Sequence, residues 1–460
     1  GQMLHRFVCL VALGLVFAAC SSDDGAEPRP QDAGADVGSD SAVEASTDGG
    51  SDAAPDASSD GAAPKLLLPK SGLAPGELGV LVNQSDPQSQ AVAAHYVAAR
   101  KIPAANVVTL SFPVNEVMTE ADFAIAKAAA DAALGPKIQA LAITWTTPYR
   151  VSCMSVTSAF ALGFDKKHCN TTGGACGPTA TVPTFDKDTV APFTDHGVRP
   201  AMMLVGKDVA TAKSLIDRGV ASDDTFPAGD GWLVRTTDTA RSVRWPAFVA
   251  LTGEWNAPKV MKLSYVDNSA GTGKNSIENQ KDVFFYFTGL ATVPGIETNT
   301  YRPGAIADHL TSYGGKVPTS GQMSIEKWIE VGATGSFGTV VEPCNYTSKF
   351  PDPRVVVPRY YRGETLIEAY FKSVLTPGEG LFVGEPLARP FGAEPVTFAD
   401  GALSVQTTHL DPKHSYAIEA ADSESGPFTP VQSGITVPSH QRVTLSIKPA
   451  DKAVYRLVRE

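Results

Sequence analysis

VFFYFTG, residues 283–289, opens the stretch that decides the fold, and VGEPL, residues 383–387, closes it. Between them lie DHLTSYGG at 308–315 and GATGSFGTVVEPC at 332–344. Short apolar runs bounded by glycine turns are typical of buried strands. The stretch therefore predicts strands at 283–287, 338–342 and 381–383, with helices at 305–313, 324–331 and 363–375 between and around them.

The same alternation runs through the preceding part of the chain. Strands are expected at 79–83, 106–110, 139–145, 201–205 and 260–266, and helices at 88–101, 120–134 and 207–220. Strands that read as continuous apolar runs and alternate with helices indicate a mainly parallel sheet covered by helices on both faces. We therefore expect an α/β domain over residues 65–392.

In such a sheet, ligand sites lie at the carboxyl ends of the strands. Polar residues follow several of the expected strands, so we predict one cleft at a common edge of the sheet. The side chains expected to line it are Tyr149, Arg150, Asp165, Asp308, His309 and Glu342.

An insertion at 146–200 interrupts the alternation and carries Cys153, Cys169 and Cys176. Together with Cys344 they make four cysteines that we expect to form disulfides, with three possible connectivities. A zinc site at Cys153, His168, Cys169 and Cys176 is the alternative, but it requires adjacent His-Cys ligands and no Cys-x-x-Cys pair is present. We predict no metal and no cofactor.

The pattern changes after residue 392. Six short strands are expected at 396–398, 402–406, 416–419, 429–431, 442–447 and 453–457, separated by turn signals. This spacing predicts a small all-β sandwich over 393–460, which resembles a fibronectin type III domain.

The N-terminus has the features of an export signal. An apolar run at 7–17 follows Arg6 and ends in Ala18-Ala19-Cys20-Ser21. Small residues before a cysteine resemble a bacterial lipoprotein signal, which implies that residues 1–20 are a signal peptide and that Cys20 carries the lipid, palmitate among its chains. Ser21 in place of an aspartate favours the outer membrane.

Residues 21–64 contain no aromatic residue and carry eleven acidic side chains against one basic one. Such a segment cannot bury enough apolar surface to fold, so we expect a disordered acidic tether. Most of the net charge of −11 lies here. Because no basic stripe or basic–aromatic pattern is present, we expect no nucleic-acid partner.

Two resemblances bear on function. The order of elements over 324–387, ending in Gly384-Glu385-Pro386-Leu387, resembles the closing half of the gingipain-like caspase fold. That family needs a His-Gly pair after one strand and a cysteine after the next, but this chain has Thr288-Gly289-Leu290 and Leu310-Thr311-Ser312 there. Residues 75–390 more closely resemble an uncharacterised family of exported proteins frequent in myxobacteria and planctomycetes, a likeness carried by the motifs at 79–83, 308–312, 335–343 and 384–387.

These observations predict a lipoprotein of the bacterial cell envelope that serves a binding or structural role, with a protein or glycan ligand at the cell surface. The alternative is a divergent hydrolase or peptidase of the caspase-like clan. Its candidate catalytic residues are His309 as base, with Cys344 or Ser312 as nucleophile. Ser312 with His309 is disfavoured if both lie on the expected helix at 305–313, because outward-pointing side chains three positions apart seldom meet productively.

Overall fold

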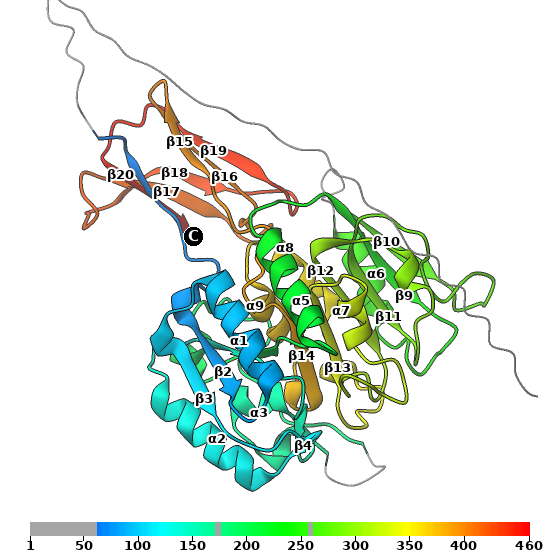
Figure 1. Ribbon diagram of the computed structural model, residues 1–460. Coiled ribbons are helices and arrows are strands. Elements are labelled where there is room, and N and C mark those ends of the chain that lie inside the picture. Colours follow the sequence, from blue (N-terminus) through cyan, green and yellow to red (C-terminus); the bar gives the residue numbers. More distant parts are fainter. Residues whose placement is uncertain (1–61, 171–175, 256–260) are drawn as a thin grey trace, which may run out of the picture. The chain divides into compact units, whose positions relative to one another are not determined.

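The computed structural model describes residues 62–170, 176–255 and 261–460. The expected signal peptide, Cys20 and nearly all of the expected acidic tether lie outside them. The central feature is a mixed α/β arrangement around a ten-stranded sheet (Figure 1). In spatial order its strands are β10 (Met261–Asp267), β9 (Gly229–Arg235), β11 (Val283–Gly289), β12 (Tyr301–Leu310), β13 (Gly335–Thr339), β14 (Gly380–Gly384), β8 (Ala201–Met203), β5 (Ala140–Ile143), β2 (Leu78–Asn83) and β3 (Val107–Leu110).

The sheet has two halves that run in opposite directions. Neighbouring strands are parallel from β10 to β13 and again from β14 to β3, but β13 and β14 pair antiparallel. The carboxyl ends of β9, β11, β12 and β13 therefore lie along one side of the sheet, where these strands end. Those of β2, β5 and β8 lie along the opposite side. The expectation of a single edge for all strand ends is wrong, because it assumed one strand direction.

Helices cover both faces of the sheet. One buried cluster contains side chains of α1 (Pro87–Arg100), α6 (Trp245–Glu254), α8 (Pro353–Tyr361) and α9 (Leu366–Phe371). The other contains side chains of α2 (Glu120–Ala133), α3 (Val156–Leu162) and α7 (Glu326–Glu330). Helix α5 (Val209–Ser222) packs against α1 and β12. The insertion adds the short helix α4 (Pro192–His196) and the strands β6 (Arg150–Val151) and β7 (Met154–Ser155), which join β4 (Val117–Met118) in a small sheet.

Residues 305–313 are not a helix. Residues 305–310 belong to β12, in which every residue from Gly304 to Leu310 is buried, and 311–313 follow the strand. A strand inside a sheet buries both of its faces, so alternate residues meet the two opposite helical layers. Ile306 belongs to one cluster and Ala307 to the other, which accounts for an apolar run without helical periodicity.

The elements that the sequence patterns did not predict include β9, α6 and α8. Helix α8 begins after Asp352, whose side chain accepts a hydrogen bond from the Arg354 N–H, and Pro353 occupies its first turn. Its interior holds three consecutive valines and Pro358, a composition that disfavours helix. Burial of those valines stabilises the helix against its intrinsic propensity.

The C-terminal residues form two small sheets, as the six expected strands require. One contains β15 (Val396–Ala399), β16 (Ala402–Thr407) and β19 (Val443–Ile447); the other contains β17 (Tyr416–Ala421), β18 (Thr429–Ile435) and β20 (Val454–Arg459). The second sheet also takes β1 (Lys65–Leu67), which pairs parallel with β20. Residues 65–67 therefore complete the C-terminal module and do not belong to the α/β domain that was expected to start there.

All four cysteines of the described residues form disulfides, as expected. Cys153 bonds Cys169 within the insertion, and Cys176 bonds Cys344 across 168 positions of sequence. The alternative zinc site is thus wrong, since its three thiolates are consumed. Within 62–170, 176–255 and 261–460 no cluster of metal-ligating side chains occurs, and no helix is long and apolar enough to span a bilayer.

Candidate functional site

Asp308 and His309, neighbours in sequence, point to opposite faces of β12. Asp308 contacts Arg244 and Tyr370 on one face, while His309 contacts Trp328 and Met323 on the other. Successive residues of a strand alternate between faces, so these two side chains cannot line one cleft.

Both ring nitrogens of His309 are engaged. Nδ1 accepts a hydrogen bond from Trp328 Nε1 at 2.9 Å, and Nε2 donates to the Met323 carbonyl at 3.1 Å. The ring is 1% exposed. Burial lowers the pKa of His309 to about 4, and the charges of Arg244 and Arg241 act in the same direction. A neutral imidazole without a free nitrogen is a structural residue and cannot deprotonate a nucleophile.

Asp308 belongs to a buried polar network. Arg244 Nη2 donates to its Oδ1 at 2.6 Å, and the Tyr370 hydroxyl donates to its Oδ2 at 2.9 Å. Burial raises the pKa of Asp308, and Arg244 and Tyr370 oppose that shift. Through these two hydrogen bonds, Asp308 of β12 joins the segment between β9 and α6 to helix α9.

No catalytic dyad forms among the predicted residues. The Cys344 sulfur is bonded to Cys176, so it offers no thiolate. Glu342 accepts a hydrogen bond from the Cys344 N–H at 2.8 Å and stabilises the turn after β13. The carbonyl of Ser312 accepts a hydrogen bond from Thr339 Oγ1 at 3.0 Å, which ties this serine to β13.

The edge at which β11 and β12 end is covered by the chain itself. A Cβ added to Gly289 would lie 1.8 Å from the carbonyl oxygen of Arg241, so the β9–α6 connection rests directly on the end of β11. Arg241 Nε also donates to Thr311 Oγ1 at 3.0 Å, at the end of β12. The place where a strand-end dyad would stand is therefore filled.

The other three predicted cleft residues have local roles. Tyr149 donates a hydrogen bond to Glu116 at 3.4 Å, and Arg150 donates to the Ser152 carbonyl at 2.5 Å. Asp165 caps the short 3₁₀ helix at Lys166–His168 by accepting from the Lys167 N–H. These contacts do not bring Tyr149, Arg150 and Asp165 together with Asp308, His309 and Glu342.

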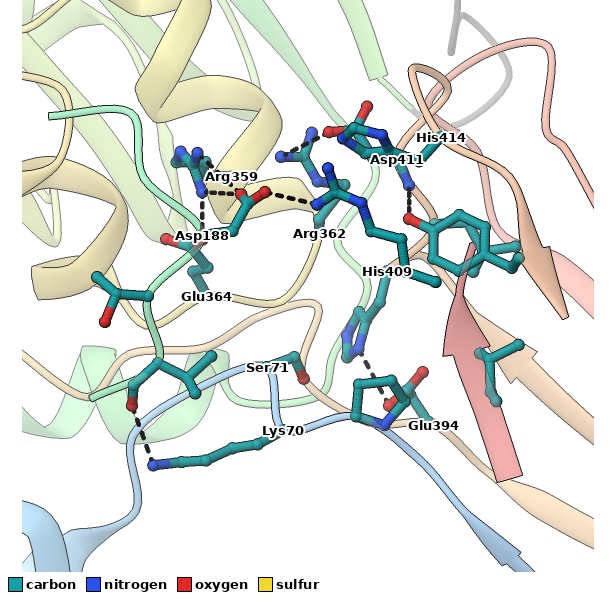
Figure 2. Close-up of a pocket in the computed structure, with 17 residues that line it drawn as sticks. Lys70, Ser71, Asp188, Arg359, Arg362, Glu364, Glu394, His409, Asp411 and His414 are labelled. Carbon is teal, nitrogen blue, oxygen red and sulfur yellow. Dashed lines mark hydrogen bonds and ion pairs between the residues drawn. The ribbon is translucent and has the colours of Figure 1, made fainter. Parts of the chain in front are cut away.

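A cavity that the sequence did not reveal lies where the α/β region meets the C-terminal module (Figure 2). Its volume is about 190 Å³, and charged side chains of both signs surround it. From the N-terminal segment, the insertion and α8 with its following turn come Lys70, Ser71, Asp188, Arg359, Arg362 and Glu364; from the C-terminal region come Glu394, His409, Leu410, Asp411, His414, Tyr416, Leu457 and Arg459.

Arg359 organises one wall of this cavity. Its guanidinium contacts Asp186 at 2.8 Å, Asp188 at 3.1 Å and Glu364 at 2.8 Å. Burial by itself would lower the pKa of Arg359, but the carboxylates of Glu364 and Asp186 outweigh burial and raise it. Asp188 also pairs with Arg459 at 2.7 Å, so this wall joins the two parts of the chain.

Two histidines of the C-terminal region also line this cavity. His409 Nδ1 lies 3.1 Å from Glu394 (Figure 2), and its Nε2 lies 2.8 Å from the Phe391 carbonyl, so both nitrogens of this ring have partners. His414 lines the cavity and is half-buried, and no hydrogen bond to its ring forms within the described part of the chain. His414 is therefore the side chain best placed to contact a ligand.

A second cavity of about 170 Å³ shares Asp188, Arg359, Arg362, Asp411 and His414 with the first. It adds His440, whose ring stacks on Trp255 with centroids 5.3 Å apart. Burial lowers the pKa of His440 to about 4. The two cavities together form one charged groove, which we call the intermodule groove.

Sequence reasoning missed the intermodule groove because its residues come from eight separate segments of the chain. The one local signal is the pair Arg359 and Arg362, three positions apart and therefore on the same side of a helix. That signal depends on recognising α8, which its valines and proline obscure.

Comparison with known proteins adds little to this geometry. No protein family matches the sequence, and no curated protein resembles it. One solved structure, titled "Structure of Protease", matches with a TM-score of 0.37 and 10% identity over 82% of this chain and 97% of that chain. At these values the likeness identifies neither the fold nor the activity of this protein.

Proposed function

We propose that the protein is a lipid-anchored binding protein of the bacterial cell envelope, and that the intermodule groove holds its ligand. The observation that carries the binding role is the charged cavity of about 190 Å³ lined by both parts of the chain. In contrast, the residues that a peptidase would use are committed to a disulfide and to buried hydrogen bonds.

The composition of the groove favours a neutral, hydroxyl-rich ligand, and we infer a glycan of the cell surface. The first cavity is lined by four carboxylates (Asp188, Glu364, Glu394 and Asp411) and four Lys or Arg cations (Lys70, Arg359, Arg362 and Arg459). A hydroxyl both donates and accepts, so it suits a wall where donors and acceptors alternate. Tyr416 and Leu457 supply apolar surface for the face of a sugar ring. At roughly 30 Å³ per water, the cavity has room for about six waters that a ligand would displace.

The fold we infer for the α/β region is a divergent caspase-like arrangement without its dyad. Strand pairing is parallel within each half of the sheet, and Leu290 and Ser312 follow the two strands at which that fold carries histidine and cysteine. The packing of Arg241 over Gly289 supports loss of catalysis at this edge.

The anchor rests on Cys20 and the segments that flank it. An acyl chain contributes about 0.8 kcal/mol per buried methylene, so diacylation at Cys20 is sufficient for stable membrane attachment. The acidic tether at 21–64 would then hold the folded region away from the lipid surface, where it can reach a glycan.

A binding measurement tests the proposed ligand. A soluble form beginning at Ser21 is incubated with purified peptidoglycan sacculi and with an array of surface oligosaccharides. We expect binding that His414→Ala weakens at least tenfold, because this residue lines the cavity and its ring forms no hydrogen bond within the described part of the chain. His196→Ala, which changes an exposed histidine that lines neither cavity of the groove, is the matched control. Equal binding by both variants, or no retention on any glycan, refutes the assignment.

Membrane fractionation tests the anchor independently of the ligand. In a bacterial host that processes lipoproteins, the wild-type chain should fractionate with the membrane and lose its first 19 residues. Cys20→Ser should release the protein into the soluble fraction without changing the disulfides. An unchanged distribution of Cys20→Ser would show that the chain is not a lipoprotein.

A further inference from the structure

A third cavity, distinct from the intermodule groove, lies at the starts of α6 and α8, where Arg244 contacts both β11 and β12. Its volume is about 350 Å³, within the range of small-molecule sites. Most of its walls are apolar and include Phe185, Phe350, Leu375 and Pro246. Its polar lining residues are Arg244, Thr347, Ser348, Asp352, Arg354 and Ser373.

The position of this cavity is one that open α/β sheets use for ligands. The chain leaves β9 through α6 to reach β10 on one side, whereas it leaves β11 to reach β12 on the other side. The connections thus diverge from two adjacent parallel strands, and a crevice at their carboxyl ends is the usual ligand position. Arg244, at the start of α6, lines the cavity and donates to the Thr288 carbonyl of β11 at 2.8 Å.

Arg244 is buried but not saturated. The side chain is 3% exposed. It donates to the Pro351 carbonyl at 3.2 Å, to the Thr288 carbonyl and to Asp308 Oδ1 at 2.6 Å. A guanidinium has five N–H donors, and Nε has no partner in the part of the chain that the structure describes. A buried donor without an acceptor is costly, so an acceptor from outside the chain would be favoured there.

Ser348 adds a second donor on the cavity wall. Its Oγ accepts from Thr376 Oγ1 at 3.4 Å, which leaves the O–H free to donate. Both α6 and α8 begin at the cavity, and helix N-termini favour negative charge. At α8 this position is taken, because the Asp352 carboxylate caps the helix and pairs with Arg354. A negatively charged ligand would therefore be attracted to Arg244 and to the start of α6.

We propose that this cavity binds a carboxylate attached to an apolar body, with the carboxylate on Arg244 and Ser348 and the body among Phe185, Phe350 and Leu375. Asp308 neutralises the guanidinium from the sheet side, and the Tyr370 hydroxyl holds that aspartate in place. A free acid and the C-terminal residue of a peptide share this chemistry. The cavity is open to solvent, so either can enter.

Calorimetric titration of the full chain with four probes tests the site. The probes are 3-phenylpropionate, its carboxamide, the peptide Gly-Gly-Phe and the amide of that peptide. We expect 3-phenylpropionate to bind with a Kd of about 1 mM or below and its carboxamide at least tenfold more weakly. Binding of the acid alone assigns a small metabolite, and binding of Gly-Gly-Phe as well assigns a peptide terminus. Equal affinity of acid and amide overturns the proposal, as does no binding at all.

Two matched variants place the ligand in the cavity without disturbing the Arg244 network. Ala247→Phe fills the cavity from α6 and should weaken binding of 3-phenylpropionate at least tenfold. Val249→Phe adds the same ring on an exposed position of the same helix and should leave binding unchanged. Unweakened binding by Ala247→Phe would overturn the proposal. As a direct readout, the Arg244 Nε–H resonance should shift with the acid and not with the amide, and a resonance unmoved by the acid would contradict the assigned contact.

Discussion

At the scale of single residues, the fold decides which chemistry a side chain retains. His309 has the residue type of a general base, but the indole of Trp328 and the carbonyl of Met323 occupy both of its nitrogens. Cys344 has the residue type of a nucleophile, but it is half of a disulfide. The residue types were visible in the sequence. Their engagement was not, because each partner comes from a different element.

The buried histidine makes stability depend on pH. The pKa of His309 is about 4 in the folded chain and about 6.5 in the unfolded chain. Between these values the unfolded chain binds a proton that the folded chain does not, so stability falls as pH falls from 6.5 to 4, by up to about 1.4 kcal/mol per pH unit. In urea unfolding, we expect the wild type to lose about 2 kcal/mol more than His309→Gln between pH 7 and pH 5. His196→Gln should behave as wild type; an identical pH dependence of His309→Gln and wild type would contradict this account.

Glu326 should act with the opposite sign. Burial, together with the neighbouring Glu330, raises its pKa to about 7, against 4.5 in the unfolded chain. The folded chain therefore binds the extra proton between these values, and the contribution to stability is lost as pH rises through 7. Glu326→Gln retains an oxygen that can accept from the Lys207 N–H, a contact of 3.0 Å in the wild type. We expect this variant to exceed wild-type stability by about 1–3 kcal/mol at pH 8 and by much less at pH 5. A larger difference at pH 5 than at pH 8 would reverse the assignment.

At the scale of elements, the sequence predicted those helices that begin with a recognisable N-cap residue. Thr119 caps α2 and Asp86 caps α1, and both helices form as expected. Residues 305–313 joined the sheet because burial on both faces outweighs helix propensity. The reversal between β13 and β14 could not be predicted, since strand direction depends on a connection through α8 and α9 that propensity does not specify.

Gly289 tests the packing of the β9–α6 connection over β11. An added Cβ would meet the Arg241 carbonyl, which is backbone and cannot move without displacing the connection. We expect Gly289→Ala to destabilise the protein by about 3 kcal/mol, at the upper end of overpacking effects. Gly253→Ala within α6, where nothing lies within 4 Å, should instead gain about 0.5–1 kcal/mol. Thermal and urea unfolding measure both, and a neutral Gly289→Ala would mean that the connection is loosely held.

At the scale of the folded region, the two parts of the chain depend on each other. The described chain enters through β1, which completes a sheet of the C-terminal module, before it reaches the ten-stranded sheet. Arg359 and Arg362 on the α8 side face Asp188 and Asp411, and Arg459 closes the network from the last strand. A domain boundary placed from the strand pattern alone misses the pairing of β1 with β20. The three residues of β1 are too short a pattern to predict which strand they pair with. The same geometry creates the intermodule groove, so ligand binding and module docking should be coupled.

The ion pair between Arg362 and Asp411 provides the measurement of that docking. Its atoms lie 3.3 Å apart, and the two side chains are 14% and 16% exposed. Burial raises the pKa of Asp411, but Arg362 and a backbone hydrogen bond outweigh it, so the net pKa is lowered and the pair stays charged at neutral pH. We expect a double-mutant cycle to alanine, followed by urea unfolding, to give a coupling energy of about 1–2 kcal/mol.

The pair Lys452–Asp422 is the control for this cycle, because both residues are exposed and belong to the C-terminal module alone. Solvent screening should leave this pair with almost no coupling energy. Adding the glycan ligand should stabilise the wild type more than Arg362→Ala, since this side chain lines both cavities of the groove. A coupling energy of Arg362 and Asp411 no larger than that of the control would contradict this account. It would mean that the modules are held together by apolar packing alone. The groove between them would then be a consequence of that packing and not a site built by charge.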